Sequence, residues 1–281
     1  MYIKKNSYLC NLIKKKLGND CQLMAIVKSD AYGHGAPMIA RELENKVSYL
    51  AVATTDEAIE LRAAGIQAPI LILGHVLPDD FRELLRANVM FCVSDFSEAS
   101  LLAEAAQEEG VIAKAHVAVD TGMGRIGMRP TKESIEEILR MHDLPYLDVY
   151  GVFSHLAQAD MADTTYTDVQ IAVFAAFVSE LRARGLSFVA HLFNSAATVS
   201  RQPQFDFVRP GIILYGLAPS KDVDFSHFGV MQEVMTFKSH IMQLKTCHKG
   251  EGISYGSTYF TQFDGQKIAT VAAGYADGVP R

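Results

Sequence analysis

The sequence of 281 residues has no tryptophan, only four cysteines and no long apolar run. A membrane-spanning helix needs roughly 18–20 consecutive apolar residues, and no segment approaches that length. The first residues, MYIKKNSYLC, are followed by a lysine-rich stretch rather than by the apolar core of a signal peptide. We therefore expect neither a membrane span nor a secretion signal.

The cysteines are few and widely separated, at Cys10, Cys21, Cys92 and Cys247. None of them forms the paired spacing that is typical of a disulfide framework or a zinc site. We expect reduced thiols in a cytoplasmic protein, and no metal.

No charge of one sign dominates, because 26 basic and 32 acidic residues give a formal net charge of −6. This balance argues against a general binder of nucleic acid or of anionic membranes. The one basic cluster, residues 14–16, is typical of a helix surface. Hydrophobic residues make up 49% of the chain, which excludes an intrinsically disordered protein.

Short apolar segments alternate with helical patterns over about the first 217 residues. The expected strands are Met24–Val27, Tyr49–Ala53, Ile70–Leu73, Met90–Val93, Ala115–Val119, Val149–Phe153, Phe188–Leu192 and Phe207–Arg209. The clearest helical segments between them are residues 54–64, 97–109, 131–141 and 166–184. Buried strands that alternate with helices predict a parallel sheet closed into a (β/α)8 TIM-type barrel. An open, doubly wound sheet is the alternative, although no GxGxxG motif follows the first strand.

The pattern changes after residue 217. Residues 237–246 and 267–273 read as strands with no long helix between them. We therefore expect a barrel over residues 1–217, followed by the beginning of a β-rich C-terminal domain over residues 218–281. A domain of that size is near the lower limit for an independent core, so we expect it to be incomplete.

Lys28 ends the first apolar segment, in MAIVKSDAYGHG (residues 24–35). Functional side chains of such barrels lie at the carboxyl ends of the strands. Burial there would favour the uncharged amine that Schiff-base chemistry requires. Gly33 and Gly35 allow the backbone to approach a ligand closely, and Tyr32 adds a hydroxyl group.

These residues carry a family resemblance. VKSDAYGHG is similar to the pyridoxal-phosphate (PLP) lysine motif of alanine racemases, which are fold-type III PLP enzymes. Matching segments follow in the family's order: VDTGMGRIG (119–127), SHLAQAD (154–160), HLFNSA (191–196), VRPGIILYG (208–216), ISYGSTY (253–259) and GYADG (274–278). The resemblance covers essentially the whole chain.

The resemblance implies a racemase that interconverts L- and D-alanine with two bases on opposite faces of the substrate. Lys28 would carry PLP as a Schiff base and act as one base. Tyr255 would be the other base and would act in the site of the partner subunit of a homodimer. D-alanine made in this way would supply peptidoglycan in the cytoplasm.

The resemblance also implies the residues that bind cofactor and substrate. Arg209 would face the pyridine nitrogen, and His155 would link Arg209 to the tyrosine of the partner. The phosphate would be held by Tyr32, Ser195, Gly211 and Ile212. Arg125 and Tyr275 would contact the substrate. Many alanine racemases have a carbamylated lysine where this sequence has Ala118.

Other interpretations of these residues stay open. Tyr255 and His155 could be packing residues, Arg125 could form a structural ion pair, and Asn194 with Ser195 could cap a helix. A serine racemase of the same family is the nearest alternative function. A fold-type III decarboxylase would place an acidic residue at the pyridine nitrogen, and a non-catalytic PLP-carrier barrel would have no equivalent of Tyr255.

Overall fold

The computed structural model describes residues 4–18, 21–222, 224 and 228–280. The chain forms two compact units, residues 1–235 and 236–281. A 3₁₀ turn, Ile212–Tyr215, follows the last barrel strand, and the first unit extends beyond it to residue 235. The expected domain boundary after residue 217 therefore stays a prediction.

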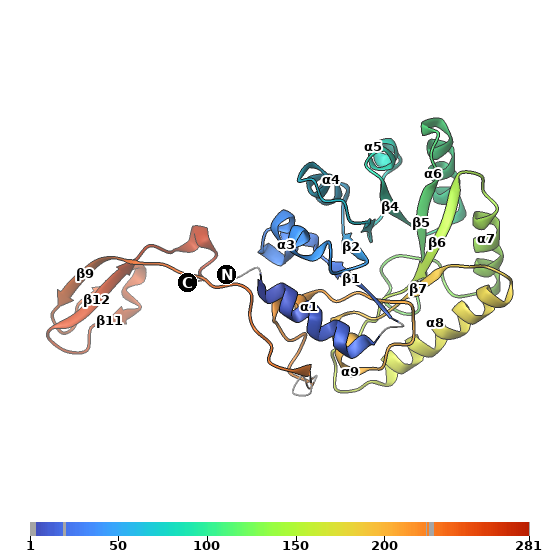
Figure 1. Cartoon of the computed structure of the whole chain (residues 1–281). Coiled ribbons are helices and arrows are strands. Elements are labelled where there is room, and N and C mark those ends of the chain that lie inside the picture. The colour runs from blue at the N-terminus through green and yellow to red at the C-terminus, as the bar shows by residue number, and fades with distance from the viewer. Residues whose placement is uncertain (1–3, 19–20, 223, 225–227, 281) are drawn as a thin grey trace. The chain divides into compact units, whose positions relative to one another are not determined.

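The first unit contains a closed barrel of parallel strands in sequential order, β1 to β8, and this confirms the predicted (β/α)8 architecture (Figure 1). The strands are β1 Gln22–Ile26, β2 Tyr49–Val52, β3 Ile70–Ile72, β4 Val89–Val93, β5 Ala113–Ala118, β6 Leu147–Phe153, β7 Val189–His191 and β8 Phe207–Val208. Pairing of β1 with both β2 and β8 closes the barrel.

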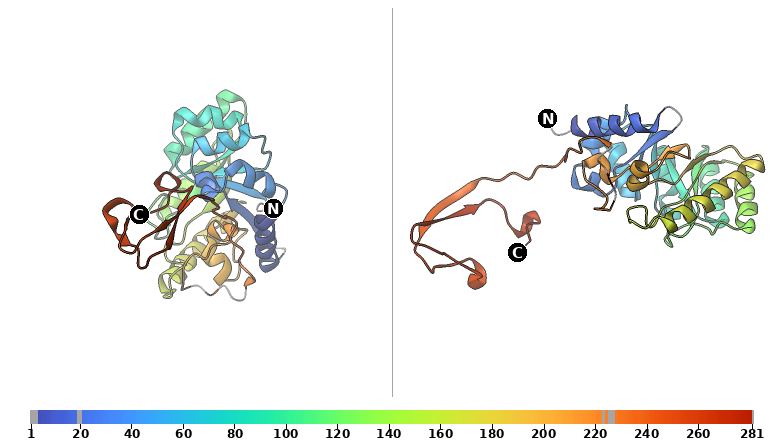
Figure 2. Two further views of the ribbon diagram at one scale, coloured as in Figure 1. Left: turned by 90° about the vertical axis from the view of Figure 1, so that its left-hand side faces the viewer. Right: turned by 90° about the horizontal axis from the view of Figure 1, so that it is seen from below.

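Helices surround this barrel, as Figures 1 and 2 show. They are α1 Lys4–Leu17, α2 Lys28–Gly33, α3 Ala36–Leu43, α4 Thr55–Ala63, α5 Phe81–Arg86, α6 Phe96–Glu109, α7 Lys132–His142, α8 Thr165–Ala183 and α9 Ser195–Ser200. Thr54, Asp95 and Thr131 cap α4, α6 and α7, because each side chain accepts the N–H of the residue three positions later. The basic cluster of residues 14–16 lies in the last turn of helix α1, as expected.

The strands contribute side chains to two parts of the core, one between the barrel and its helices and one inside the barrel. Leu23 and Ala25 of β1 pack between the barrel and its helices, whereas Met24 and Ile26 point into the barrel interior. Both faces of each strand are therefore buried. This is why the strands appear in the sequence as continuous apolar runs rather than as alternating patterns.

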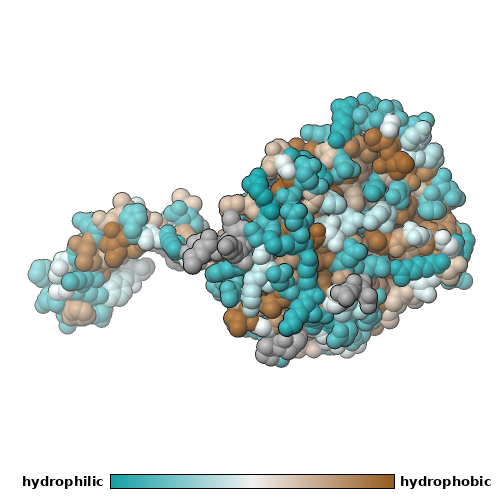
Figure 3. Space-filling model, viewed as in Figure 1, coloured by the Kyte–Doolittle hydropathy of each residue, from teal (hydrophilic) through white to brown (hydrophobic). Residues whose placement is uncertain are grey.

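The second unit is built of short antiparallel pairs. Strand β9 (Ile241–Cys247) pairs with β12 (Gln266–Val271), and β10 (Gly252–Ile253) pairs with β11 (Tyr259–Phe260). This confirms the predicted β-rich C-terminal domain. Apolar side chains gather on its surface, where Ile241, Met242 and Leu244 are all more than half exposed (Figure 3).

Three expectations about absent features concern the described part of the chain. There, no helix is long and apolar enough to cross a membrane. No group of three or more histidine, cysteine or acidic side chains in those same residues is placed to hold a metal ion. All four cysteines are buried free thiols.

Candidate active site

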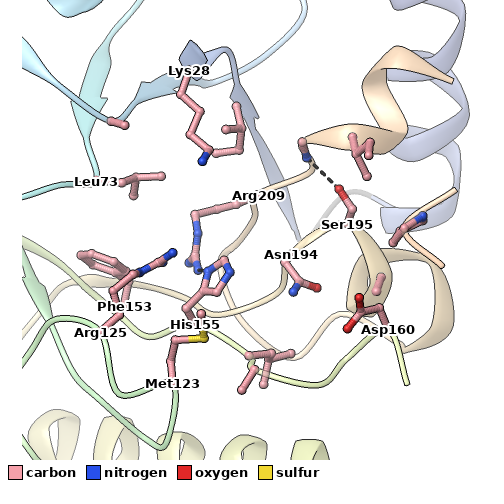
Figure 4. Close-up of a pocket in the computed structure, with 18 of the residues that line it drawn as sticks. Lys28, Leu73, Met123, Arg125, Phe153, His155, Asp160, Asn194, Ser195 and Arg209 are labelled. Atoms are coloured by element: carbon pink, nitrogen blue, oxygen red, sulfur yellow. Dashed lines mark hydrogen bonds between the residues drawn. The ribbon is translucent and has the colours of Figure 1, made fainter. Parts of the chain in front are cut away.

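A cavity of about 550 Å³ opens at the carboxyl ends of the barrel strands (Figure 4). Eight of the predicted site residues line it: Lys28, Tyr32, Arg125, His155, Ser195, Arg209, Gly211 and Ile212. The other two, Tyr255 and Tyr275, belong to the second unit, where their side chains are 77% and 63% exposed. The residues that line the cavity all belong to the first unit.

Lys28 stands on an unusual piece of backbone. Strand β1 ends at Ile26, one residue before the end of the expected strand, and Lys28 opens α2. The four residues after it, Ser29 to Tyr32, have φ angles between 50° and 56°, so they form one left-handed turn without a glycine. Such a conformation costs about 1–2 kcal/mol per residue, so the surrounding structure must hold it in place.

Two carboxylates hold the left-handed turn. Glu57 of α4 accepts the N–H of Ser29 at 2.5 Å with one oxygen and the N–H of Ala53 at 2.7 Å with the other. Asp30 accepts the N–H of Ala36 at 2.6 Å, which ties the turn to α3. The turn directs the Lys28 amine into the cavity, where Figure 4 shows it opposite Arg209.

Tyr32, Ser195 and Gly211 form a polar cradle at one side of the cavity. The N–H of Gly211 donates to Ser195 Oγ at 2.8 Å (Figure 4). A Cβ atom on Gly211 would lie 2.2 Å from the Tyr32 hydroxyl oxygen, so only glycine fits beside this tyrosine. Burial raises the pKa of Tyr32 and keeps its hydroxyl protonated as a donor. Asn194 caps α9 by accepting the N–H of Ala197 at 3.2 Å.

Arg209 is the polar centre of the barrel mouth, although its side chain is only 3% exposed. It donates to His191 Nδ1 at 2.6 Å and to His155 Nδ1 at 3.3 Å. It also donates to the carbonyl oxygens of Ser154 at 2.5 Å and Leu192 at 3.2 Å. Burial, and secondly the nearby Arg125, lowers the pKa of Arg209 to about 9, so it stays charged at neutral pH.

The histidines around Arg209 are neutral. Burial lowers the pKa of His155 to about 3, and the charges of Arg209, Arg125 and Lys28 add to the effect. The pKa of His191 is also lowered, first by burial and then by the charge of Arg209. A neutral imidazole can accept a hydrogen bond from the guanidinium group, which a charged one could not do.

Arg125 lies on the DTGMGR loop, between β5 and α7. Asp120 shapes this loop by accepting the N–H groups of Gly122 and Gly124, both at 2.9 Å. Burial alone would raise the pKa of Asp120, but these hydrogen bonds and the charge of Arg129 lower it. The ion pair of the loop joins Arg129 to Asp120 at 3.5 Å, and Arg125 faces the cavity instead.

Ala118 occupies an apolar place beneath this loop. It is buried with Cys92 and Phe153, and Ile126 packs against the three. Its side chain cannot donate or accept a hydrogen bond, so it cannot orient Arg125 as a carbamylated lysine could.

Three residues of this site are absent from the sequence-based prediction. His191 lies within a motif that the sequence identifies, but its hydrogen bond to Arg209 joins positions 18 residues apart. His116 lies in an otherwise mostly apolar strand that also contains Lys114, and Glu57 is one of several acids in α4. Nothing in their local sequence distinguishes them from ordinary core and surface residues.

The carboxyl ends of the strands carry the active site in barrels of this kind, and this cavity gathers an amine, a guanidinium group and a cradle of donors there. The chain is therefore a TIM-type barrel enzyme. The sequence profile of the alanine racemase N-terminal domain matches residues 7–219, and that of the alanine racemase C-terminal domain matches residues 234–281. The chain belongs to the alanine racemase family.

Individual relatives agree with this assignment. The alanine racemase of Desulforamulus reducens is 44% identical over 272 residues, which are 96% of this chain and 73% of that protein. The alanine racemase of Clostridium tetani is 43% identical over 92% of this chain and 67% of its own length. An alanine racemase structure from Clostridium difficile 630 has a TM-score of 0.93 and 38% identity, covering 99% of this chain and 73% of that one.

A further structure, the alanine racemase from Bacillus anthracis with bound L-Ala-P, has a TM-score of 0.87 and 35% identity. The match covers 98% of this chain and 72% of that one. An alanine racemase from Clostridium difficile 630 in complex with cycloserine matches with a TM-score of 0.91 and 36% identity, covering 99% of this chain and 72% of that one. These similarities confirm the predicted family.

Proposed function

We propose that the chain binds PLP through Lys28 and interconverts L- and D-alanine. The observation that carries this proposal is the arrangement of the cavity, in which the Lys28 amine and the Arg209 guanidinium group face one another beside the cradle of Tyr32, Ser195 and Gly211 (Figure 4). Membership of the alanine racemase family supports it.

The residues present fit PLP. The space beside the Tyr32 hydroxyl exists only because Gly211 has no Cβ, and hydroxyl and backbone N–H donors are the groups that bind a phosphate. Ser195 and Ile212 would complete the phosphate site. PLP, when bound, withdraws electrons from the substrate Cα and makes its proton acidic.

Arg209 would donate to the pyridine nitrogen, and its surroundings favour a racemase over a decarboxylase. Its guanidinium group is held by imidazoles and carbonyl oxygens and is charged at neutral pH. A donor that keeps its own proton leaves the pyridine nitrogen without a full positive charge. Electron withdrawal is then moderate, which disfavours transamination as a side reaction.

The second base would come from a partner subunit. Lys28 would move a proton on one face of the substrate and Tyr255 on the other. Tyr255 belongs to the second unit and is 77% exposed, and exposed apolar side chains such as Met242 and Leu244 lie in the same unit. We propose a homodimer in which this surface is covered and Tyr255 reaches the partner's cavity, where His155 would orient it.

The substrate would be held by its carboxylate. Arg125 faces the cavity and would contact that carboxylate, and Tyr275 would line the entry path. The names of the relatives favour alanine as the substrate. The product D-alanine would supply peptidoglycan in the cytoplasm, a compartment that suits the buried free thiols of the chain.

Borohydride reduction followed by peptide mass spectrometry tests the cofactor assignment. The chain is mixed with PLP, reduced and digested, and the pyridoxyl group is located. We expect the label on Lys28, its loss in Lys28→Ala, and its retention in the control Lys132→Ala, which changes an exposed lysine of α7. A label that stays in Lys28→Ala would contradict the assignment. Formation of D-alanine from L-alanine, measured with the same samples, tests the activity.

A further inference from the structure

A second histidine lies behind His191, deeper in the barrel. His116 on β5 and His191 on β7 are both fully buried, and His116 Nδ1 lies 2.8 Å from His191 Nε2. His191 Nδ1 in turn accepts from Arg209 at 2.6 Å. A continuous chain of hydrogen bonds therefore joins the cavity residue Arg209 to His116, which does not line the cavity.

The direction of these hydrogen bonds follows from the chemistry of arginine. Arg209 can only donate, so His191 Nδ1 has no proton and the single proton of the neutral ring is on Nε2. That proton is donated to His116 Nδ1, so the neutral His116 ring carries its own proton on Nε2. Burial lowers the pKa of both rings, to about 3 for His116, which agrees with two neutral rings.

The barrel contains a dedicated space for His116. The pairing of β5 with β6 shifts register between Ala115 and His116, because β6 has one extra residue there. This irregularity sets Gly151 against the imidazole, and a Cβ on Gly151 would lie 2.1 Å from His116 Nδ1. Only glycine leaves room for the ring in this position.

The other side of His191 is fixed as well. The ring of Phe153 stacks on His191 with 5.1 Å between the centroids and 4° between the planes. Phe153 also lies under the Arg209 guanidinium group, at 5.4 Å. Stacking restricts the plane of the His191 ring, but it leaves rotation within that plane to be set by hydrogen bonds at the two nitrogens.

We propose that His116 is a positioning residue for the reaction: it accepts the Nε2 proton of His191 and thereby holds His191 so that Arg209 is aimed at the cofactor. The expected effect of His116 on turnover rests on the proposed function. The hydrogen bonds from Arg209 through His191 to His116 do not, because they are present in the protein without cofactor.

The first test needs neither cofactor nor activity. Nitrogen-15 NMR of histidine side chains in the chain without PLP reports which ring nitrogen carries the proton. We expect His191 protonated at Nε2 only, with a slowly exchanging, low-field proton signal. His116→Phe fills the space but removes the acceptor and should abolish that signal. His116→Asn returns an acceptor oxygen near the Nδ1 position and should keep it.

The second test is kinetic. With PLP bound, we expect about a tenfold lower kcat in His116→Phe, little change in KM for alanine, and recovery to within about threefold of the natural value in His116→Asn. Gly151→Ala keeps the imidazole but displaces it, so it should resemble His116→Phe. This variant also provides the test if the phenylalanine variant does not fold.

Two results would overturn the proposal. One is a His191 ring protonated at Nδ1 in the natural chain. The other is a His116→Phe variant with the His191 signal and kcat unchanged. Failure of the natural chain to bind PLP or to racemise alanine is a different outcome, because it contradicts the proposed function while the NMR result still decides the role of His116.

Discussion

Arg209 illustrates how a single buried charge can be stabilised and still remain available to a ligand. Its Nη1 and Nη2 atoms donate to neutral imidazoles and carbonyl oxygens, and within the described residues no carboxylate forms an ion pair with it. A carboxylate partner would neutralise the charge locally. The neutral acceptors found here stabilise the buried guanidinium group but do not cancel its positive charge, which a pyridine nitrogen in the cavity would meet.

Gly211→Ala tests the cradle at the scale of one residue. The new Cβ would meet the Tyr32 hydroxyl at 2.2 Å, so either the tyrosine or the backbone at residue 211 must move. We expect the affinity for PLP to fall about tenfold to a hundredfold, since one good charged hydrogen bond contributes roughly 1.5–3 kcal/mol.

The measurement for this variant is an absorbance titration with PLP. Ser195→Ala, which removes the hydroxyl that accepts the Gly211 N–H without adding bulk, should show a smaller loss. Unchanged affinity in Gly211→Ala would mean that the phosphate does not bind beside Tyr32.

The strands and the connection after β1 show what sequence patterns can predict at the scale of elements. The barrel strands are predicted to within two residues at every end, because burial on both faces gives continuous apolar runs. The left-handed turn of residues 29–32 has no such signature, since none of its residues is glycine. Its conformation is imposed from outside, by hydrogen bonds to Glu57 and from Ala36. The hydrogen bond to Glu57 joins residues 28 positions apart in the sequence, which no local pattern reveals.

Glu57→Gln tests whether α4 holds that turn. One carboxylate oxygen would become an NH₂ group facing a backbone N–H of Ser29 or Ala53, which leaves a donor without an acceptor. We expect the free energy of unfolding to fall by about 1–3 kcal/mol and PLP affinity to fall with it.

Urea unfolding followed by circular dichroism measures the stability of this variant. Glu60→Gln is the matched control, because Glu60 is an exposed acid on the same helix and should tolerate the change. Equal stability of the two variants would show that the turn does not depend on Glu57.

At the scale of the whole molecule, the buried His116 and His191 and the partly buried His155 couple the stability of the barrel to pH. His116 and His155 have folded-state pKa values of about 3, and that of His191 is lowered too, whereas an unfolded histidine titrates near 6.5. The unfolded chain therefore binds more protons below pH 6.5. Stability is fully present above that pH and is lost as the pH falls through it.

We expect the free energy of unfolding of the chain without PLP to fall by about 3–4 kcal/mol between pH 6 and pH 5. His116→Phe removes one of three titrating groups, so its slope should be about one third smaller. His142→Gln, which changes an exposed histidine at the end of α7, should keep the natural slope. If the free energy of unfolding of His116→Phe had the same pH dependence as that of the natural chain, His116 would titrate alike in the folded and the unfolded chain.

The proposed dimer makes a prediction that depends on which chain supplies each base. Lys28→Ala and Tyr255→Phe would each lower turnover at least a hundredfold when alone. When the two variants are co-expressed, half of the dimers formed at random are mixed. If Tyr255 acts in the partner's cavity, each mixed dimer has one site with both natural residues, and about a quarter of the natural turnover returns. If each cavity used its own tyrosine, every site would lack one base and co-expression would restore nothing. The racemisation rate of the purified mixture therefore decides whether the second unit works within its own chain or across the subunit interface.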